Sequence, residues 1–332
     1  MCKMQRKFIF FFGLLPFYLF SQNNFQRSEY IETMKETMNI KLDIDNDIQT
    51  FEYHTKNLSY NISPNLNSRT NLSFNYRFIS FKIGYSPRFL MPDNSSEKGK
   101  TRIFKFQGDF FYKNWMQTLE FSKIKGYYVS DIIQNDGTFT NSDLLILPYL
   151  NTVNIYGRTL YKFNPKLSLE SIFKQTEIQR KSAGSLLTSI GYGYLDIRDK
   201  TSIQDLNTFS LIANAGYLYN FVISKRWYAF MGFMPGAGLE FNKVTTKIDD
   251  ERNISRNTDF VINLYTQMGI GYNSDSFYGG TDFRGIYTPR ENNAIIKFNT
   301  ARNIFRIYVG YRFKAPRFLK KSVDWLEDQN PF

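Results

Sequence analysis

The sequence contains almost no cysteine or histidine, and this scarcity excludes several classes of function. Cys2 is the only cysteine and His54 the only histidine. Transition metals in proteins depend on thiolate and imidazole ligands, so we expect no metal and no other cofactor. A serine hydrolase of the serine–histidine type would need His54 to fold back against a serine, although it precedes the regular strand patterns. We therefore expect His54 to be a loop residue.

Long hydrophobic runs are also missing, apart from one close to the amino terminus. Residues 8–20 are apolar except for one glycine and one proline, three basic residues precede them, and small Ser21 is followed by polar residues. This layout is typical of a cleaved secretory signal peptide, and the run is shorter than the ~20 apolar residues that span a bilayer. We predict export, with cleavage near Ser21. Cys2 precedes the run, whereas a lipoprotein needs its cysteine after it.

Aromatic residues are abundant, at 18% of the chain, although the mean hydropathy is only −0.40. They alternate with polar residues in several stretches, most clearly at 71–78, 104–112 and 305–313. A charged set facing one way and an aromatic set facing the other suits a wall with lipid outside and water inside. The sequence therefore predicts an all-β fold, a transmembrane antiparallel up-and-down β-barrel. Trp115 and Trp227 then fit an aromatic girdle, with sugar stacking as the alternative.

Twelve strands can be placed from this alternation, with 10–14 as the acceptable range. Short connections are expected at the periplasmic end and longer ones outside, and those at 180–183 and 199–206 break this order. Either one external loop is unusually short, or one strand is misplaced. The predicted strands are 67–79, 80–90, 101–113, 115–127, 149–163, 166–179, 184–198, 207–222, 226–243, 257–272, 275–288 and 302–313.

Four segments follow from these patterns. Residues 1–21 form the signal peptide, and 22–66 form an amino-terminal extension that is either periplasmic or a plug. Residues 67–313 form the outer-membrane barrel, and 314–332 a periplasmic tail. Within the extension, 28–38 shows apolar residues at helical spacing, as does the tail.

Three further stretches could carry chemistry, but simpler interpretations exist. The stretch Lys181–Ser185 allows serine–lysine chemistry, yet its small residues also suit a tight turn. Asp43, Asp45 and Asp47, and the cluster at 249–251, raise the possibility of calcium, but the first set lacks the glycine and terminal glutamate of a calcium loop. We interpret the aspartates as solvated polar positions and predict no catalytic, metal or cofactor residues.

The formal net charge is +12, which invites a nucleic-acid hypothesis. We reject nucleic acid as a partner, because the chain is predicted to be exported and its basic residues are spread along strands. We expect them instead in the lumen and at rims that face anionic lipid headgroups. The expected partners are outer-membrane lipids and lipopolysaccharide, with the barrel-assembly machinery during insertion.

The residues predicted to face the lumen give the main functional indication, because eight are basic and two are acidic. Rings of arginine and lysine favour anions in pores. A passive channel or transporter for small anionic or polar solutes is therefore the first hypothesis. A non-conducting structural or adhesion barrel is the alternative, and a lipid hydrolase is third and least supported. The lumenal candidates are Arg77, Lys82, Lys105, Asp109, Arg158, Lys162, Glu170, Lys174, Arg306 and Arg312.

Several short stretches, in their order along the chain, resemble an uncharacterised family of outer-membrane proteins, domain-of-unknown-function family 4421. The resemblance spans most of the mature chain and implies a barrel in the outer membrane. It implies no activity, and no functional residue is carried over. The stretches are Ser63-Pro64-Asn65 before Thr70-Asn71-Leu72, Gly99-Lys100-Thr101, Lys125-Gly126-Tyr127-Tyr128, Lys181–Ser185, Val222–Trp227 and Val309–Pro316.

Overall fold

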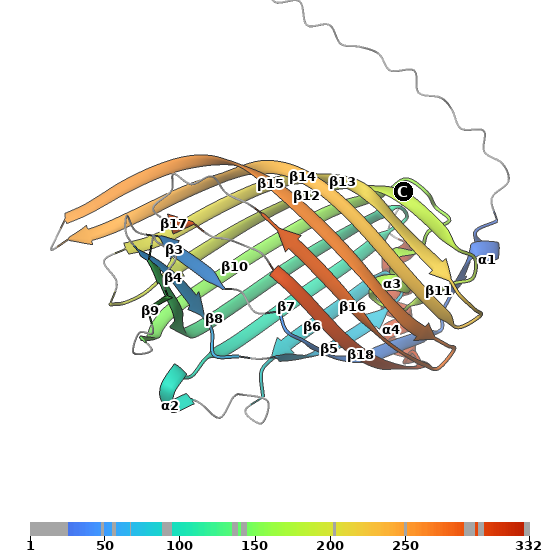
Figure 1. Cartoon of the computed structure of the whole chain (residues 1–332). Coiled ribbons are helices and arrows are strands. Elements are labelled where there is room, and N and C mark those ends of the chain that lie inside the picture. Colours follow the sequence, from blue (N-terminus) through green and yellow to red (C-terminus); the bar gives the residue numbers. More distant parts are fainter. Residues whose placement is uncertain are drawn as a thin grey trace, which may run out of the picture.

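The computed structural model shows a closed antiparallel barrel of 12 strands (Figure 1). It describes residues 26–47, 50–54, 58–66, 68–87, 95–134, 139–140, 145–201, 204–248, 251–288, 296–297 and 302–328. Neighbouring wall strands are hydrogen-bonded in the order in which they follow along the chain. The wall strands are β2 (Thr37–Asp45), β5 (Arg69–Tyr76), β6 (Ile79–Tyr85), β7 (Arg102–Tyr112), β8 (Trp115–Gln134), β10 (Ile146–Lys162), β12 (Ala183–Arg198), β13 (Gln204–Val222), β14 (Trp227–Ile248), β15 (Glu251–Asn273), β16 (Phe277–Tyr287) and β18 (Arg302–Lys314).

Closure comes from pairing between the first and last wall strands. β18 lies antiparallel to β2, with Ile307 opposite Ile44 and Arg312 opposite Asn39. At the other side of the sheet, β10 pairs with both β8 and β12. The wall therefore has no free edge, which is the condition that lets a sheet sit in a bilayer without unpaired backbone groups.

Strand β2 corrects the expectation that residues 22–66 lie outside the wall. Ile40, Leu42 and Ile44 alternate with polar residues that point inward and are buried. This period-two pattern was present in the sequence, but the helical spacing of apolar residues over 28–38 obscured it. The barrel therefore begins at residue 37, not at residue 67.

The strand predicted over 166–179 is wrong, and its removal restores the order of the connections. These residues instead form α3 (Leu169–Phe173) and β11 (Glu177–Gln179), and β11 pairs with β1 (Ile31–Thr33). The segment does not alternate between apolar and polar residues as a wall strand does. Its apolar residues pack against apolar side chains on the inner face of the wall, not against lipid. With β2 added and this strand removed, the wall still has 12 strands.

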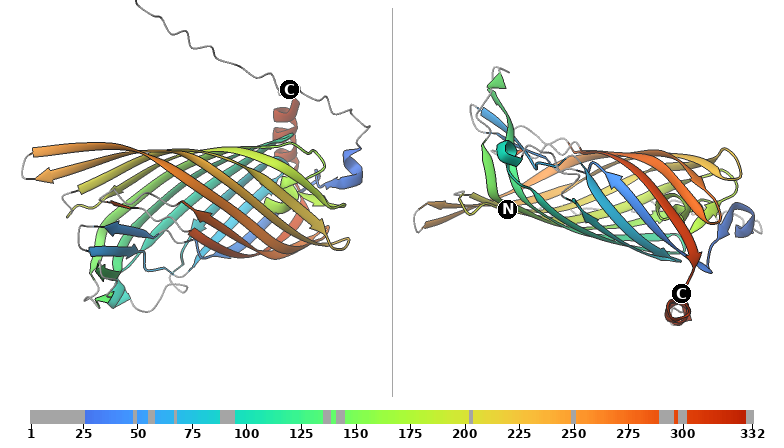
Figure 2. Two further views of the ribbon diagram at one scale, coloured as in Figure 1. Left: turned by 45° about the horizontal axis from the view of Figure 1, so that its top comes forward. Right: turned by 90° about the horizontal axis from the view of Figure 1, so that it is seen from below.

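The two ends of the barrel differ in their connections. Two-residue turns at 77–78 and 113–114 lie at one end, together with α1 (Arg27–Tyr30) and α4 (Arg317–Asp328) (Figure 2). Arg77 and Lys113 have positive φ angles of 46° and 50°, as such tight turns require. Short turns mark this end as periplasmic. The opposite end carries longer connections with α2 (Ser95–Lys98), β3 (Phe51–His54), β4 (Leu58–Ser63), β9 (Phe139–Thr140) and β17 (Ile296–Lys297).

The outer face of the wall is a belt of exposed apolar side chains. Phe74, Phe106, Ile190, Phe233 and Ile307 are all exposed although each lies on a strand that is paired on both sides. Water would oppose such a continuous surface, whereas hydrocarbon accepts it, so the molecule is a transmembrane barrel of the outer-membrane type. In the part of the chain that the structure describes, no helix is long and apolar enough to cross a membrane.

Helix α4 lies across the outside of the wall, near its periplasmic end and roughly perpendicular to the strands (Figure 2). Arg77 Nη1 donates to Asp324 Oδ1 at 2.6 Å and to Glu327 Oε2 at 3.0 Å, and Lys320 Nζ pairs with Glu36 at 2.7 Å. Val323 is the buried residue of the helix. The polar contacts fix the helix to the rim while its remaining aromatic residues stay exposed.

The position of β2 in the wall can be tested with a charge on its outer face. We expect Leu42→Arg to lower the free energy of unfolding by about 2–4 kcal/mol, because the side chain faces hydrocarbon. Leu326→Arg is the matched control, since Leu42 is 45% exposed and Leu326 on α4 is 43% exposed. The control should cost less than about 1 kcal/mol. Urea unfolding in lipid vesicles measures both, and equal losses would contradict the wall position.

Candidate functional site

The candidate site is the barrel lumen, which has two parts. Its periplasmic end is filled by the connection between β10 and β12, residues 163–182, which we call the plug. Beyond the plug lies a cavity of about 270 Å³, which we call the lumenal cavity. A second hollow of about 290 Å³ lies below the plug, between it and α4.

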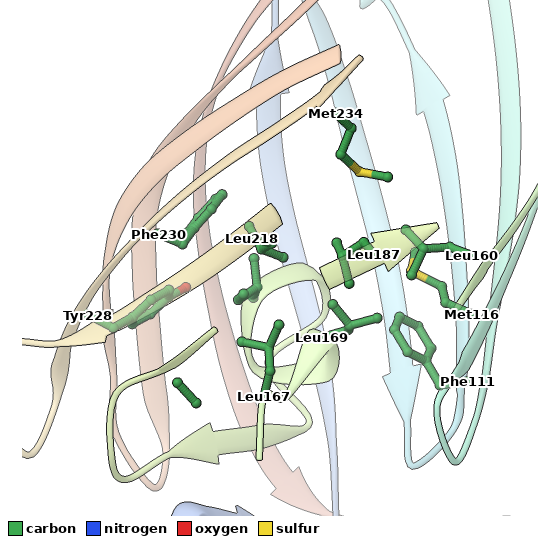
Figure 3. Packing of buried hydrophobic residues seen from close by; sticks show 12 residues of the cluster. Phe111, Met116, Leu160, Leu167, Leu169, Leu187, Leu218, Tyr228, Phe230 and Met234 are labelled. Atoms are coloured by element: carbon green, nitrogen blue, oxygen red, sulfur yellow. The ribbon is translucent and has the colours of Figure 1, made fainter. Parts of the chain in front are cut away.

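An apolar cluster anchors the plug to the inside of the wall (Figure 3). Leu167, Leu169 and Ile172 of the plug are buried, and they pack between side chains from opposite sides of the barrel. Burying a side chain of this size contributes roughly 2 kcal/mol. The wall residues of the cluster are Phe111, Met116, Leu160, Ala183, Leu187, Leu218, Tyr228, Phe230 and Met234.

Polar groups of the wall satisfy the carbonyl end of α3. Lys41 Nζ donates to the Phe173 carbonyl at 2.7 Å, and Asn39 Nδ2 donates to the Lys174 carbonyl at 3.1 Å. The last carbonyls of a helix have no partner within the helix and carry its negative dipole end. Cations at this position therefore neutralise and cap a backbone that would otherwise be buried without hydrogen bonds.

Arg312 joins the plug to both the wall and a periplasmic turn. Its Nε donates to the Gln175 carbonyl at 3.1 Å, its Nη2 to Asn273 Oδ1 at 2.5 Å, and its Nη1 to the Ser274 carbonyl. Gln175 has a φ of 53°, a left-handed conformation that these contacts hold in place. The side chain predicted to face a conduction path therefore holds the plug.

Two lysines and two glutamates make further polar contacts, some within the plug and some to neighbouring segments. Lys162 Nζ donates to the Leu167 carbonyl, and Lys174 Nζ lies 3.1 Å from Glu170. Glu177 accepts a hydrogen bond of 2.6 Å from Ser168, and its other carboxylate oxygen lies 2.7 Å from Arg27. Burial, followed by repulsion from Glu170, raises the pKa of Glu177 to about 7, against the attraction of Arg27.

The lumenal cavity is lined by eight basic and five acidic side chains, so the excess of basic residues is smaller than expected. Of the acids omitted from that expectation, Asp45 and Asp47 come from β2 and the residues that follow it, and Glu120 and Glu240 come from β8 and β14. The lining cations are Lys41, Arg69, Lys82, Lys105, Arg158, Arg284, Arg302 and Arg306, and the lining acids are Asp45, Asp47, Asp109, Glu120 and Glu240.

Asp47 is the centre of the largest charge network. Its carboxylate lies 2.9 Å from Arg69, 3.1 Å from Lys105 and 2.5 Å from Arg302. Lys105 also reaches Glu120 at 2.7 Å. These groups come from β5, β7, β8 and β18, so the network ties distant parts of the wall together. The prediction that Asp43, Asp45 and Asp47 are solvated is wrong, because all three are buried.

Other cations of the wall are paired in the same way. Arg306 lies 2.5 Å from Asp282, and Lys82 lies 3.4 Å from Asp43, which is also buried. A buried charge without a partner is costly, so these acids are what allows basic side chains inside the barrel.

Arg158 and Arg284 differ from the other cavity cations. Among the residues that the structure describes, Arg158 has no acid within ion-pair distance, and its guanidinium lies 5.3 Å from the Tyr265 ring centre. Arg284 is 3.7 Å from Asp282, and its Nε is buried without a hydrogen-bond partner in the described ranges. These two side chains have donors left for a ligand.

The structure thus places the ten lumenal candidates in three different environments. Lys82, Lys105, Asp109, Arg158 and Arg306 line the cavity. Lys162 and Arg312 of the wall donate to plug carbonyls, and Glu170 and Lys174 belong to the plug and pair with each other. Arg77 lies in a periplasmic turn and binds α4. Residues that sequence reasoning missed are Lys41, Arg69, Glu120, Arg284 and Arg302; the alternation within 37–45 would have found Lys41.

The described residues show no arrangement that would support serine–lysine chemistry or metal binding. Lys181 pairs with Glu29 at 3.1 Å, while Ser182 Oγ accepts from the Val222 amide, so that stretch shows no lysine–serine contact. Within the described ranges, no cluster of three or more His, Cys, Asp or Glu could hold a metal. The side chain of His54, and residues 249–250 of the acidic cluster, lie outside the described residues.

Comparison with known proteins identifies the family. The family described as Domain of unknown function (DUF4421) matches residues 27–313. The chain belongs to this family. No sequence among the curated proteins matches this DUF4421 member. The match begins ahead of β2, in agreement with the position of that strand in the wall.

Solved structures similar to this DUF4421 barrel are outer-membrane proteins at very low identity. OmpT of Vibrio cholerae is 6% identical with a TM-score of 0.31, covering 85% of this chain and 97% of that one. The β domain of the Bordetella autotransporter BrkA is 6% identical with a TM-score of 0.37, covering 84% and 100%. These similarities say nothing of activity.

The hold of Arg312 on the plug can be measured with a cysteine reporter. Ser171→Cys, in a chain lacking Cys2, places a thiol in the buried plug. We expect Arg312→Gln to raise its labelling rate about tenfold or more, because hydrogen bonds from a charged donor contribute about 1.5–3 kcal/mol. Arg302→Gln on the same strand breaks the Asp47 network and should leave labelling unchanged. Equal acceleration in both variants would contradict a specific role for Arg312.

The raised pKa of Glu177 predicts that the plug docks more firmly in acid. The docked plug takes up a proton between the ordinary pKa of 4.5 and about 7, so this stabilisation is complete below pH 4.5 and is lost as pH rises through about 7. Labelling of Ser171→Cys should accelerate by up to about 70-fold between pH 5 and 8, beyond the change seen with Glu177→Gln. Identical pH profiles for the two chains would refute the coupling.

Proposed function

We propose that this protein is a non-conducting outer-membrane barrel that works through its external surface. We also propose that residues 1–21 direct its export and are removed. The plug is the observation that carries the first proposal, because it occupies the periplasmic end of the lumen, through which a solute would have to pass. Apolar packing, capped carbonyls and ion pairs all support its docked position.

The use of the basic residues favours this proposal over a passive anion channel. Arg312, Lys162 and Lys174 donate to plug carbonyls or pair with its acids, and Lys105 and Arg306 pair with wall acids. These positive charges are therefore paired within the protein, and the pairing reduces the positive potential that a permeating anion would meet.

The external end offers the surface through which such a barrel would act. β14 and β15 extend together as a long hairpin beyond the other strands (Figure 1). β3, β4, β9 and β17 add a further small sheet at the end of β8. Extended, hydrogen-bonded structures of this kind present a defined surface for adhesion or for contact with other envelope components.

A second candidate function is the binding of a small polar or anionic solute in the lumenal cavity. Arg158 and Arg284 favour it, because both line the cavity and retain donors without acid partners at hydrogen-bond distance. The mixed charge of the remaining lining suits a ligand with both signs. Passage of such a ligand would then require movement of the plug.

Single-channel conductance in a planar bilayer tests the proposal. We expect the refolded full-length protein to be silent. Replacement of residues 166–180 by a short glycine–serine link should produce discrete steps, because it removes the obstruction. Arg302→Gln, which leaves the plug intact, should stay silent. Heat-modifiable gel mobility confirms folding in each case.

Steps from the unaltered protein with an anion-selective reversal potential would overturn the proposal in favour of a channel. Silence of the plug-deleted protein, when folded, would show that the cavity walls close the lumen without the plug, and the plug would lose its assigned role. Added solute that opens the unaltered protein would support the second candidate.

A further inference from the structure

Five basic side chains gather on the outer face of the barrel at its external end. Along β14, outward-facing Leu239 and Phe241 belong to the apolar belt, and Lys243 and Lys247 continue the same face beyond them. Along β15, Phe260 lies in the belt, and the outward face then continues toward the external end with basic residues. We call the set the basic patch: Arg198, Lys243, Lys247, Arg252 and Arg256.

Within the basic patch, like charges lie directly opposite each other. In the β14–β15 register, Lys243 pairs with Arg256 and Lys247 pairs with Arg252. Like charges in directly opposed positions destabilise a sheet. Two such pairs lie four residues apart on one face, so a nearby negative charge would stabilise the hairpin.

Described acidic side chains supply a negative charge to only one of the four opposed basic residues. Lys247 Nζ pairs with Asp205 at 2.6 Å, but no ion pair forms between a described acid and Lys243, Arg252 or Arg256. Asp259 lies on the opposite face, where Asn242 and Asn257 donate to it. The hairpin thus separates its charges, with the basic ones outside.

Four of the five side chains of the basic patch, all except Arg256, line a hollow of about 360 Å³. Four strands contribute to it, since Arg198 lies on β12, Asp205 on β13, Lys243 and Lys247 on β14, and Arg252 on β15. Arg198 pairs with Asp196 at 2.9 Å but remains 62% exposed, so its other donors are free for a ligand at the surface. The hollow is large enough for a phosphorylated headgroup.

We propose that the basic patch binds the phosphate groups of a phosphorylated glycolipid in the outer leaflet. The patch begins where the apolar belt ends, which is the depth of lipid headgroups, and it faces lipid rather than the lumen. Arginine and lysine form charge-assisted hydrogen bonds to phosphate oxygens, with arginine binding in a bidentate manner. The bound phosphates would offset the repulsion across β14 and β15. This inference is independent of whether the lumen conducts.

The test compares thermal unfolding of the full-length protein in detergent with and without lipid A, the phosphorylated glycolipid probe. The patch variant carries Lys243→Gln and Arg256→Gln, which together remove one opposed pair. Lys225→Gln with Arg226→Gln, at an exposed periplasmic turn, removes the same charge at the other end. The unaltered protein and the control should gain stability from lipid A. The patch variant should bind it about tenfold more weakly or worse.

A second signature separates binding from general loss of stability. Without lipid A, the patch variant should unfold at the same or a higher temperature than the unaltered protein, because the opposed charges are gone. The charge-keeping exchange Lys243→Arg with Arg256→Lys should retain the effect of lipid A. Removing a second pair, with Lys247→Gln and Arg252→Gln, should weaken binding further.

Three results would overturn the inference. Lipid A lacking its phosphates could stabilise the protein as well as intact lipid A, which would assign the effect to acyl chains on the belt. Inorganic phosphate at equal concentration could give the same stabilisation, which would indicate a free-anion site. The patch variant and the periplasmic control could also respond to lipid A alike.

Discussion

Capping of the plug carbonyls by the barrel wall is the interaction on which the rest of the lumen depends. A short helix inside a barrel ends in carbonyl groups that water cannot reach, and Lys41, Asn39 and Arg312 supply the missing donors. These donors come from β2 and β18, the two strands whose pairing closes the barrel. The strands that close the wall therefore also bind the plug.

The charge inside the barrel follows from this requirement. Cations that cap the plug or cross the lumen need acids nearby, and Asp43, Asp47, Glu120 and Asp282 provide them. Buried ion pairs contribute little net stability, but separating one partner from another is costly. The network thus favours one register for the wall strands. Arg158 has no described acid within ion-pair distance, so its guanidinium keeps hydrogen-bond donors for a ligand.

The two membrane faces of the molecule have different chemistry. At the periplasmic rim, Arg77 and the acids of α4 form local pairs, and the helix stays against the wall. At the external rim, Lys243 and Lys247 lie opposite arginines, and among the described acids only Asp205 forms an ion pair with these four side chains. The apolar belt between them is continuous, so the asymmetry lies in the rims. An asymmetric bilayer with phosphorylated glycolipid on one side matches that asymmetry.

The sequence by itself determined the class of fold, because a period of two with aromatic residues on one face is a local property that any wall strand shows. It placed 11 of the 12 wall strands in outline, and it predicted which face of β7 and β18 points inward. It could not decide that 166–179 leaves the wall, because apolar Leu169 and Ile172 find their partners on strands distant in the chain. Nor could it show that Lys41 and Arg312 serve the plug, since which acid or carbonyl a lumenal cation meets depends on how the sheet closes. Only the tertiary structure showed that residues 163–182 pack inside the barrel, because that depends on contacts across it.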